Sequence, residues 1–562
     1  MNSASKTSPS IFLLDDTILV LYSFLTNSES LKFQLVNKNV HYNLKLLPRR
    51  KSYSTKIGWK KHKNVVRALS IFSRFFPHSQ KLVFTHFSSD DIDKEDAIAI
   101  ATLYPDITEL VVGELPVPYA ANANEDISNY SPTRNYRRRN SAAQNDRHVA
   151  QETFEYTVFQ DSEVLISFAK RMQYLQVLSL LNVGGDMTEA LNVLISSCHH
   201  LVHLTIGNSA LRCECGWEVL TKAFCAFRCL EKFHFEGHLF HHNGRDAPLE
   251  FSSDLKDVKN LKSLSIGGRF TARMIRDASS IFYNLNELSL GRVSDTTLRA
   301  LLDVYGGEDI CLQSLSLSAR ISPSLTLTMI VSFLRQCKKL KKFRGCNFHS
   351  VNHHLINSLI SLNMNDGGLE EISLVDYANW NSGQPTDLAK KRLIGSFLNL
   401  RSFSFMSLSD DLLITLSTSC PLLEQLVIQN SPRVTDKSSV AIGGFKHLNY
   451  LSLKKTKMTC KVQVQLISQI GYRLKKLQIM NFSEGFFGDF DMANILSHCG
   501  QAYQVSIKST SLSLEFIEML AKMAYQVQKN LQLLELGECS IEFFDKLKDA
   551  LPYILIHAII LE

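Results

Sequence analysis

The chain has 562 residues, 45% of them hydrophobic, so it is long enough to bury a large core. It contains no apolar run of about 18 residues, which argues against a membrane span. The net charge of +7 is uneven, because Ser30 to Ser89 holds 13 Lys or Arg and no Asp or Glu, leaving −6 for the rest. A basic block beside a mildly acidic remainder predicts two surfaces with different partners.

Residues 11–47 have the pattern of two or three short helices. Their apolar residues recur mainly at three- and four-residue steps, and the main ones are Leu14, Ile18, Leu21, Leu25, Leu35 and Val36. Asp15-Asp16 interrupts the apolar start, which argues against a secretory signal and suits the first turn of a helix. A module this small completes its core against a partner or a neighbouring domain.

Residues 48–112 include most of the basic block. We expect basic connecting helices there, followed by the first degenerate repeats at Leu82 and at Ile107. Residues 113–160 are rich in Asn, Ser and Ala and poor in aliphatic residues. That composition predicts a disordered insertion that interrupts the first repeats.

A repeated unit dominates residues 161–562. In the copy Leu423-x-x-Leu426-x-Ile428, Leu426 and Ile428 are two positions apart, which is the period of a half-buried strand. The first residue of each copy is an anchor, and the anchors are Leu175, Leu201, Leu230, Leu261, Leu285, Leu312, Leu340, Leu369, Leu400, Leu423, Leu448, Leu474, Ala502 and Leu531. They recur about every 27 residues, within the 20–29 residues of a leucine-rich repeat.

The pattern therefore predicts an α/β leucine-rich repeat solenoid, a horseshoe with parallel strands inside and helices outside. A small all-α module would precede it at the N-terminus. The helices expected between strands include Met187–Cys198, Trp217–Phe227, Leu325–Cys337 and Leu514–Tyr525. The apolar segment Tyr553–Leu561 is expected to cap the open end.

Cysteines recur at one repeat position. Four of the twelve lie three residues before an anchor, and these are Cys198, Cys337, Cys420 and Cys499. We interpret them as small hydrophobic residues and reduced thiols of a cytosolic or nuclear protein. A zinc site is conceivable at the cluster Cys213, Cys215, Cys225, Cys229, His234 and His238. The spacing lacks paired C-x-x-C, which favours buried thiols.

The strand positions between two apolar residues should point to the concave face. They are Ser179, Thr205, His234, Ser265, Ser289, Ser316, Arg344, Ser373, Ser404, Val427, Ser452, Gln478, Ser506 and Glu535. Eight of these 14 are Ser, a small polar lining that leaves room for a protein surface or peptide. The residues expected to bind a substrate are Lys342, Arg344, Ser373, Ser404, Ser452, Lys454 and Lys476. Their basic members indicate an acidic or phosphorylated ligand, although lysines that only maintain solubility fit equally well.

No catalytic motif is present: the sequence has no Gly-rich phosphate loop, no H-E-x-x-H and no nucleophile elbow. The basic block could attract nucleic acid, but it lacks a recognisable reading motif, so an acidic protein partner is the favoured interpretation. No cofactor or metal is expected, and we expect a chain that performs no chemistry itself.

Residues 11–47 resemble an F-box. The matching residues are Leu14-Asp15-Asp16-x-Ile18, Ser23-Phe24-Leu25 and Leu35-Val36-Asn37-Lys38. The family motif has Pro after its first Leu and Trp after its basic residue, and both are absent here. The repeats resemble the cysteine-containing type found in F-box proteins, which carries a C-terminal I-T-D triplet. Corresponding triplets here are Val434-Thr435-Asp436, Val293-Ser294-Asp295 and Leu408-Ser409-Asp410.

The resemblance implies the substrate-recognition subunit of a Skp–cullin–F-box ubiquitin ligase. Leu14, Ile18, Leu21, Leu25, Leu35 and Val36 would then bind the Skp-type adaptor, and through it a cullin. The solenoid would hold an unknown protein substrate for proteasomal degradation. One alternative is a leucine-rich repeat scaffold or adaptor protein unrelated to ubiquitin ligases. Another is a GTPase-activating leucine-rich protein, against which the repeat type and the lack of an acidic tail count.

Overall fold

The computed structural model describes residues 19–21, 54–58, 81–85, 94–104, 106–112, 162–180, 185–207, 213–236, 238–240, 258–269, 271–306, 310–318, 327–346, 353–363, 368–375, 387–480, 486–508, 510–528, 530–551 and 554–561. The chain divides into two compact units, residues 1–261 and 262–562. The sequence does not predict this division within the repeat array. The insertion expected over 113–160 lies outside the described residues.

The first unit holds a parallel sheet and its helices. Its strands are β1 (Leu19–Leu21), β2 (Ser54–Gly58), β3 (Lys81–Thr85), β4 (Glu109–Val112), β5 (Val177–Leu180), β7 (His203–Gly207) and β9 (Lys232–Glu236), each paired in parallel with the next. Its helices are α3 (Lys94–Leu103), α4 (Ser162–Ala169), α5 (Thr188–Ser197) and α6 (Trp217–Ala226). A second, small parallel sheet is formed by β6 (Gly185–Asp186), β8 (Cys213–Gly216) and β10 (His238–Phe240).

Part of the N-terminal region differs from the prediction. Leu19–Leu21 is a strand that pairs with β2, not a helix, and β2 itself lies where connecting helices were expected. The run Ile18 to Tyr22 is continuously apolar, and periodicity cannot distinguish a short buried strand from a helix in such a run. The rest of the module at 11–47 lies outside the described residues. It therefore stays a prediction.

The second unit alternates strands and helices throughout. Its strands are β11 (Ser263–Arg269), β12 (Glu287–Arg292), β13 (Ser314–Ser318), β14 (Lys342–Cys346), β15 (Glu371–Val375), β16 (Ser402–Met406), β17 (Gln425–Thr435), β18 (Tyr450–Lys457), β19 (Lys476–Met480), β20 (Gln504–Ile507), β21 (Leu533–Ser540) and β22 (Leu555–Leu561). Its helices are α7 (Ala272–Asp277), α8 (Ser279–Phe282), α9 (Asp295–Tyr305), α10 (Leu327–Gln336), α11 (His353–Asn363), α12 (Asp387–Ser396), α13 (Asp410–Ser419), α14 (Ser438–Gly443), α15 (Cys460–Ile470), the 3-10 turn η4 (Gly471–Arg473), α16 (Asp489–His498), α17 (Leu514–Gln528) and α18 (Ile541–Ala550).

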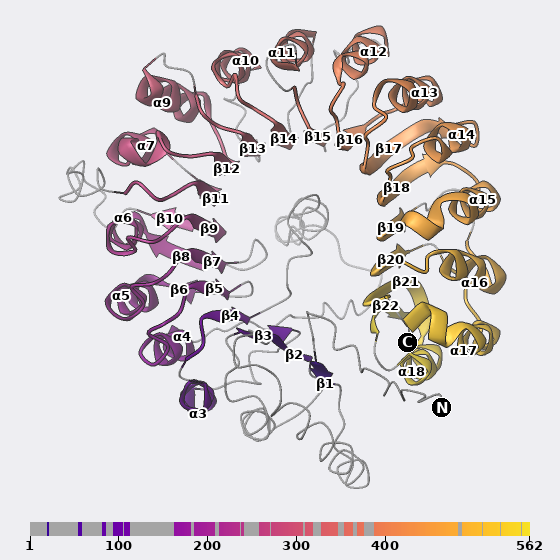
Figure 1. Ribbon diagram of the computed structural model, residues 1–562, viewed down its shortest axis with the longest axis horizontal. Helices are drawn as coiled ribbons and strands as arrows, with labels where there is room; N and C mark the ends of the chain where they lie inside the picture. Colours follow the sequence, from indigo (N-terminus) through magenta and orange to yellow (C-terminus); the bar gives the residue numbers. More distant parts are fainter. Residues whose placement is uncertain are drawn as a thin grey trace, which may run out of the picture. The chain divides into compact units, whose positions relative to one another are not determined.

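Each strand of the second unit pairs in parallel with the next one in the sequence, from β11 to β22. The strands line the inner side of an arc and the helices its outer side (Figure 1). The expected cap Tyr553–Leu561 supplies β22, the last strand of this sheet. The predicted α/β leucine-rich repeat solenoid is thus the observed fold class.

The anchors determine where the strands begin. A strand starts two residues after every one of the fourteen anchors, and each anchor side chain is buried. Within β14, Phe343 points into the core while Lys342 and Arg344 lie on the other face, as the period of two requires. Even the weakest copy, Ala502 with Val505, is fully buried and precedes β20. A buried leucine contributes about 2–5 kcal/mol relative to alanine, so the repeating pattern is enough to define the array.

Acidic residues at the starts of helices connect consecutive repeats. Asp410 accepts hydrogen bonds from the Thr435 N–H (2.8 Å), the Thr435 hydroxyl (2.7 Å) and the Ser438 hydroxyl. Asp436 accepts the Thr459 N–H at 2.7 Å, and Asp489 accepts the Ser513 N–H at 2.8 Å. We call these the helix-start contacts. They give the Ser/Thr-Asp pairs of the sequence a physical role, since each carboxylate satisfies backbone and hydroxyl donors of the following repeat.

Candidate functional site

The side chains between buried strand residues form continuous rows on the inner face of the second unit. One row contains Ser265, Ser289, Ser316, Arg344, Ser373, Ser404, Val427, Ser452, Gln478, Ser506 and Glu535, with successive members paired in register. A parallel row begins at Ser263 and includes Lys342, Glu371 and Lys476. Parallel strands lie about 4.8 Å apart, so these side chains are lateral neighbours.

The rows are accessible over β12 to β15, and we call this part the open strand face. Glu287 and Lys342, from the row that begins at Ser263, are exposed there. The side chains of the row that begins at Ser265 are half-buried; these are Ser289, Ser316, Arg344 and Ser373. Three predicted substrate residues, Lys342, Arg344 and Ser373, therefore lie together on one accessible surface. It carries both charges, unlike the purely basic surface that the sequence suggested.

Arg344 is already ion-paired. Its Nε donates to Oε1 of Glu371, which starts the next strand and is only 6% exposed. At the edge of the same strands, Lys341 Nζ lies 3.1 Å from Glu370 Oε1. A phosphate or carboxylate ligand would have to compete with Glu371 for Arg344. The signal that could have revealed this pair is the Glu370-Glu371 doublet at the start of the following strand.

The inner face is buried over β16 to β20. Ser404 is 7%, Ser452 0% and Lys476 5% exposed, so their expected role as partner-facing residues is not supported by their burial. Lys454 is half-buried. The Tyr450 and Ser452 hydroxyls each lie 3.2 Å from Gln478 Oε1, and Lys476 Nζ lies 5.0 Å from the Tyr450 ring centre.

Side chains from the neighbouring strand cause this burial. A serine on one strand is covered by a longer side chain from a strand only about 4.8 Å away. Gln478 reaches across to Ser452 in this way. Of the predicted substrate residues, Lys342, Arg344 and Ser373 are thus accessible on β14 and β15, and Lys454 is half-buried on β18. The remaining three, Ser404, Ser452 and Lys476, are buried.

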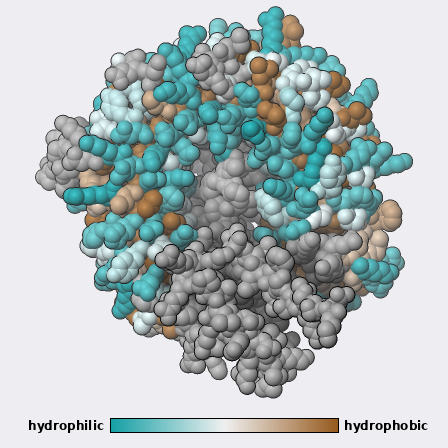
Figure 2. Space-filling view, viewed as in Figure 1, coloured by the Kyte–Doolittle hydropathy of each residue, from teal (hydrophilic) through white to brown (hydrophobic). Residues whose placement is uncertain are grey.

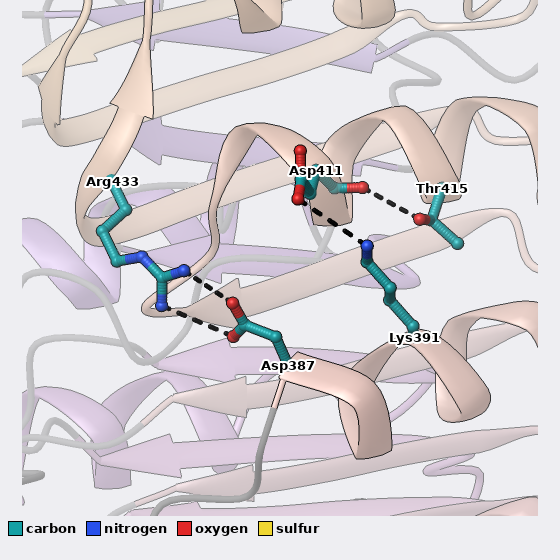
Figure 3. Close-up of polar contacts among 5 residues, drawn as sticks. All are labelled: Asp387, Lys391, Asp411, Thr415 and Arg433. Carbon is teal, nitrogen blue, oxygen red and sulfur yellow. Dashed lines mark hydrogen bonds and ion pairs between the residues drawn. The ribbon is translucent and has the colours of Figure 1, made fainter.

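A polar network ties three elements at the edge of the second unit (Figure 3). Arg433 forms a fork with Asp387, with Nη2 at 2.6 Å from Oδ2 and Nη1 at 3.5 Å from Oδ1. Lys391 Nζ lies 3.7 Å from Asp411 Oδ2, and the Thr415 hydroxyl donates to the Asp411 carbonyl at 2.8 Å. These pairs are 20 or more residues apart except Thr415–Asp411, so local sequence patterns did not indicate them.

Lys390 lies beside this network and is buried. Its Nζ donates to the carbonyl of Ser407 at 3.2 Å, and Ser407 has a φ of 53°. Burial lowers the pKa of Lys390, Asp387 raises it in part, and Arg433 adds to the lowering. The contact satisfies a carbonyl at a left-handed turn where β16 ends, so we assign it a structural role.

The repeat cysteines lie at the ends of helices. The Cys420 thiol lies 3.3 Å from the carbonyl of Phe397, the residue after α12, and the Cys198 thiol lies 3.6 Å from the carbonyl of Ala169, the last residue of α4. The thiols thus satisfy carbonyls that have no helical partner. Burial raises the pKa of Cys198, Cys420 and Cys499 to about 12, so these groups stay protonated at neutral pH.

The cysteines of the cluster around Cys213 lie in different environments. Within the described ranges, no group of three or more His, Cys, Asp or Glu side chains could hold a metal ion. Cys215 is buried, Cys225 is half-buried and Cys229 is exposed. Their different environments give no observation that favours zinc.

We expect the denatured protein to titrate close to 12 thiols without reductant. In the native protein the exposed Cys229 and Cys311 should react first, because protonated, buried thiols are poor nucleophiles. The measurement is a disulfide-exchange colour assay before and after denaturation, with zinc determined on the same sample. Stoichiometric zinc, or clearly fewer thiols, would contradict the interpretation.

The adaptor-binding residues predicted at the N-terminus are not placed by the structure. Leu14, Ile18, Leu25, Leu35 and Val36 lie outside the described residues, and Leu21 belongs to β1 without a described side chain.

None of the helices that the structure describes is long and apolar enough to cross a membrane. On the face drawn in Figure 2, the described surface is mostly hydrophilic, and apolar side chains appear in separate patches.

No protein-family model matches the chain, and no curated protein matches it. Among solved structures, the Rad7–Elc1 complex of yeast is similar over 71% of this chain and 80% of that chain, with 13% identity and a TM-score of 0.32. A TLR13 complex with the RNA ssRNA13 is similar over 70% and 68%, with 12% identity and a TM-score of 0.31. Similarities at this level carry no conclusion about function.

Proposed function

We propose that this chain is a non-catalytic recognition subunit that holds a protein substrate on the open strand face. The observation that carries the proposal is the accessible, mixed-charge surface of β12 to β15, where Glu287 lies on β12, Lys342 on β14 and the Arg344–Glu371 pair bridges β14 and β15. A rigid row of small polar residues flanked by charges suits a folded protein surface or an extended peptide better than a small molecule.

The ligase context rests on the F-box resemblance of residues 11–47. In that proposal a Skp-type adaptor binds this module and connects the chain to a cullin. The bound substrate is then held near the ubiquitin-loaded enzyme, and its effective local concentration rises. Such a chain would act in the cytoplasm or nucleus.

We expect Leu14→Ala with Ile18→Ala to lower adaptor recovery about tenfold or more, because both residues would form the apolar contact with the adaptor. The measurement is affinity purification of the full chain followed by quantitation of the adaptor and the cullin. Circular dichroism should show that the repeat array is unchanged. Equal adaptor recovery from the double variant and the wild type would refute the F-box assignment.

A leucine-rich scaffold unrelated to ubiquitin ligases is the second candidate. The pairing of β1 with β2 favours it, because a strand in residues 11–47 continues the repeat sheet toward the N-terminus. The same purification distinguishes the two candidates. A scaffold would yield partners without adaptor or cullin, even from wild type.

We expect Lys342→Glu to weaken substrate capture about tenfold and to leave adaptor binding unchanged, since Lys342 is exposed on the open strand face. Arg344→Glu is unsuitable for this test, because it would place a second carboxylate against the buried Glu371 and disturb the fold.

The measurement is quantitative comparison of proteins captured by wild type and by Lys342→Glu. Lys461→Glu is the matched control, because Lys461 is also an exposed lysine but lies on helix α15. If both variants recover the same substrates in wild-type yield, recognition does not use this face.

A further inference from the structure

Four large apolar side chains are exposed near the C-terminal end of the array. Phe486 is 69% and Phe490 73% exposed, and they are the only phenylalanines among the exposed large hydrophobics of the described residues. Leu514 and Ile541 are exposed as well and are the first residues of α17 and α18. We call these four residues the C-terminal rim. Single exposed apolar residues are common, but a cluster of large ones marks an interaction surface.

The four residues share one edge of the second unit. Residues 486–490 run beside 510–514, because Phe487 and Thr510 form a parallel bridge and the Ser513 N–H donates to Asp489. The starts of α17 and α18 are packed together through the stacked rings of Phe516 and Phe543, whose centres are 6.3 Å apart. Leu514 and Ile541 each lie two residues before one of these rings. The starts of α16, α17 and α18 are therefore consecutive neighbours (Figure 1, yellow).

Carboxylates outnumber cations on the helices beside the rim: α17 and α18 carry five acidic residues and three lysines, Lys522, Lys546 and Lys548. Exposed acidic residues on α17 and α18 are Glu515, Glu518, Glu542, Asp545 and Asp549. Acidic residues in the first turn of a helix are explained by the helix dipole. Glu518 and Asp545 are the fifth residues of their helices and fall outside that explanation. Among the described residues, Glu542 pairs with Lys546 at 2.8 Å, whereas Glu518 and Asp545 make no ion pair.

We propose that the C-terminal rim binds a basic segment of a partner protein, in which Lys or Arg residues alternate with aliphatic or aromatic ones. The apolar residues of such a segment would cover Phe486, Phe490 and Leu514, and its cations would face Glu515 and Glu518. The edge from α16 to α18 spans about 20 Å at the usual helix spacing of 8–10 Å, a length that an extended segment of about six residues covers. This surface is separate from the open strand face and does not depend on the proposed function.

The test uses the full chain and a fluorescent peptide of about ten residues in which lysine and leucine alternate, long enough to span the rim in extended form. Fluorescence anisotropy should show binding that weakens with added salt. Phe486→Ser with Phe490→Ser should reduce the affinity about tenfold, and Glu515→Lys with Glu518→Lys should do the same. The matched control is Leu398→Ser with Val440→Ser, which removes two apolar side chains exposed elsewhere in the second unit and should leave binding unchanged.

Five outcomes would overturn the proposal. The wild type fails to bind the peptide, or the control pair loses as much affinity as the phenylalanine pair. A peptide of alternating lysine and serine binds as tightly as the lysine–leucine peptide, which would show that charge alone drives binding. A peptide of alternating glutamate and leucine binds as tightly, which would show that the charge of the peptide does not matter. Light scattering is measured in parallel: if the phenylalanine pair converts a dimer to a monomer, the occupant is a second copy of the chain and not a basic partner.

Discussion

Replacing Gly291 by alanine is expected to lower the free energy of unfolding by about 3 kcal/mol, near the upper end of what overpacking costs. A Cβ at this position in β12 would lie 2.0 Å from the carbonyl oxygen and 2.7 Å from the Cα of Gly267 in β11. Both contacts are with backbone, which cannot rotate away as a side chain could. The two strands would therefore have to separate locally. Urea unfolding measures the loss, and hydrogen exchange of the β11 and β12 amides locates it.

The control for this prediction is Gly395→Ala. Gly395 is an exposed residue near the end of helix α12, and an added Cβ there meets nothing within 4 Å. Alanine should stabilise the helix by up to about 1 kcal/mol, because it loses less conformational freedom on folding than glycine. If both variants change stability by the same small amount, the close approach of the two strands is not a constraint.

Replacing Asp410 by alanine is expected to lower the free energy of unfolding by about 2–4 kcal/mol. A hydrogen bond to a charged acceptor contributes about 1.5–3 kcal/mol, and three donors would lose their acceptor in this variant. The donors are the Thr435 N–H, the Thr435 hydroxyl and the Ser438 hydroxyl. Asp411→Ala is the matched control. Asp411 is the next residue, but it is exposed and only makes a 3.7 Å ion pair with Lys391, which contributes about 1 kcal/mol or less.

The effect of Asp410 depends on pH. Burial acts to raise the pKa of Asp410, but the hydrogen bonds from Ser438 and Thr435 and the charge of Lys437 outweigh it, so the pKa lies below the ordinary 3.8. A lowered pKa means that the charged group stabilises the fold above the unfolded-state pKa and that this stability is lost as the pH falls through the folded-state pKa. The difference in urea midpoint between wild type and Asp410→Ala should be constant near neutrality and shrink in acid. A difference that grows in acid would contradict the assignment.

The repeat array was predictable because its signal is local and repeated. Each anchor fixes a strand two residues later, and the substitutions Phe343 for leucine and Ala502 for leucine remain buried. The strand β1 was not predictable, because Ile18 to Tyr22 has no periodicity that separates strand from helix. The small sheet of β6, β8 and β10 was also missed, since strands of two to four residues are too short to show an alternation.

The candidate site was predictable only in part. The alternation within one strand correctly placed Lys342 and Arg344 on the same face. It could not reveal the Glu371 carboxylate beside Arg344, or the Gln478 amide over Ser452, because both come from the next strand about 27 residues later. Exposure in a parallel sheet depends on lateral neighbours, and a single sequence does not show which long side chain leans over which short one.

The fork between Arg433 and Asp387 has a mechanical consequence. Asp387 follows β15 and Arg433 lies on β17, so the contact reaches past the intervening repeat. When an arc of repeats bends, the spacing between second neighbours changes about twice as much as that between first neighbours. A contact over that distance resists bending more than an equal contact between adjacent repeats. Together with the helix-start contacts of Asp410 and Asp436, it links the repeats from β15 to β18 beyond their strand pairing, so we expect this stretch of the arc to resist bending more than strand pairing alone would allow.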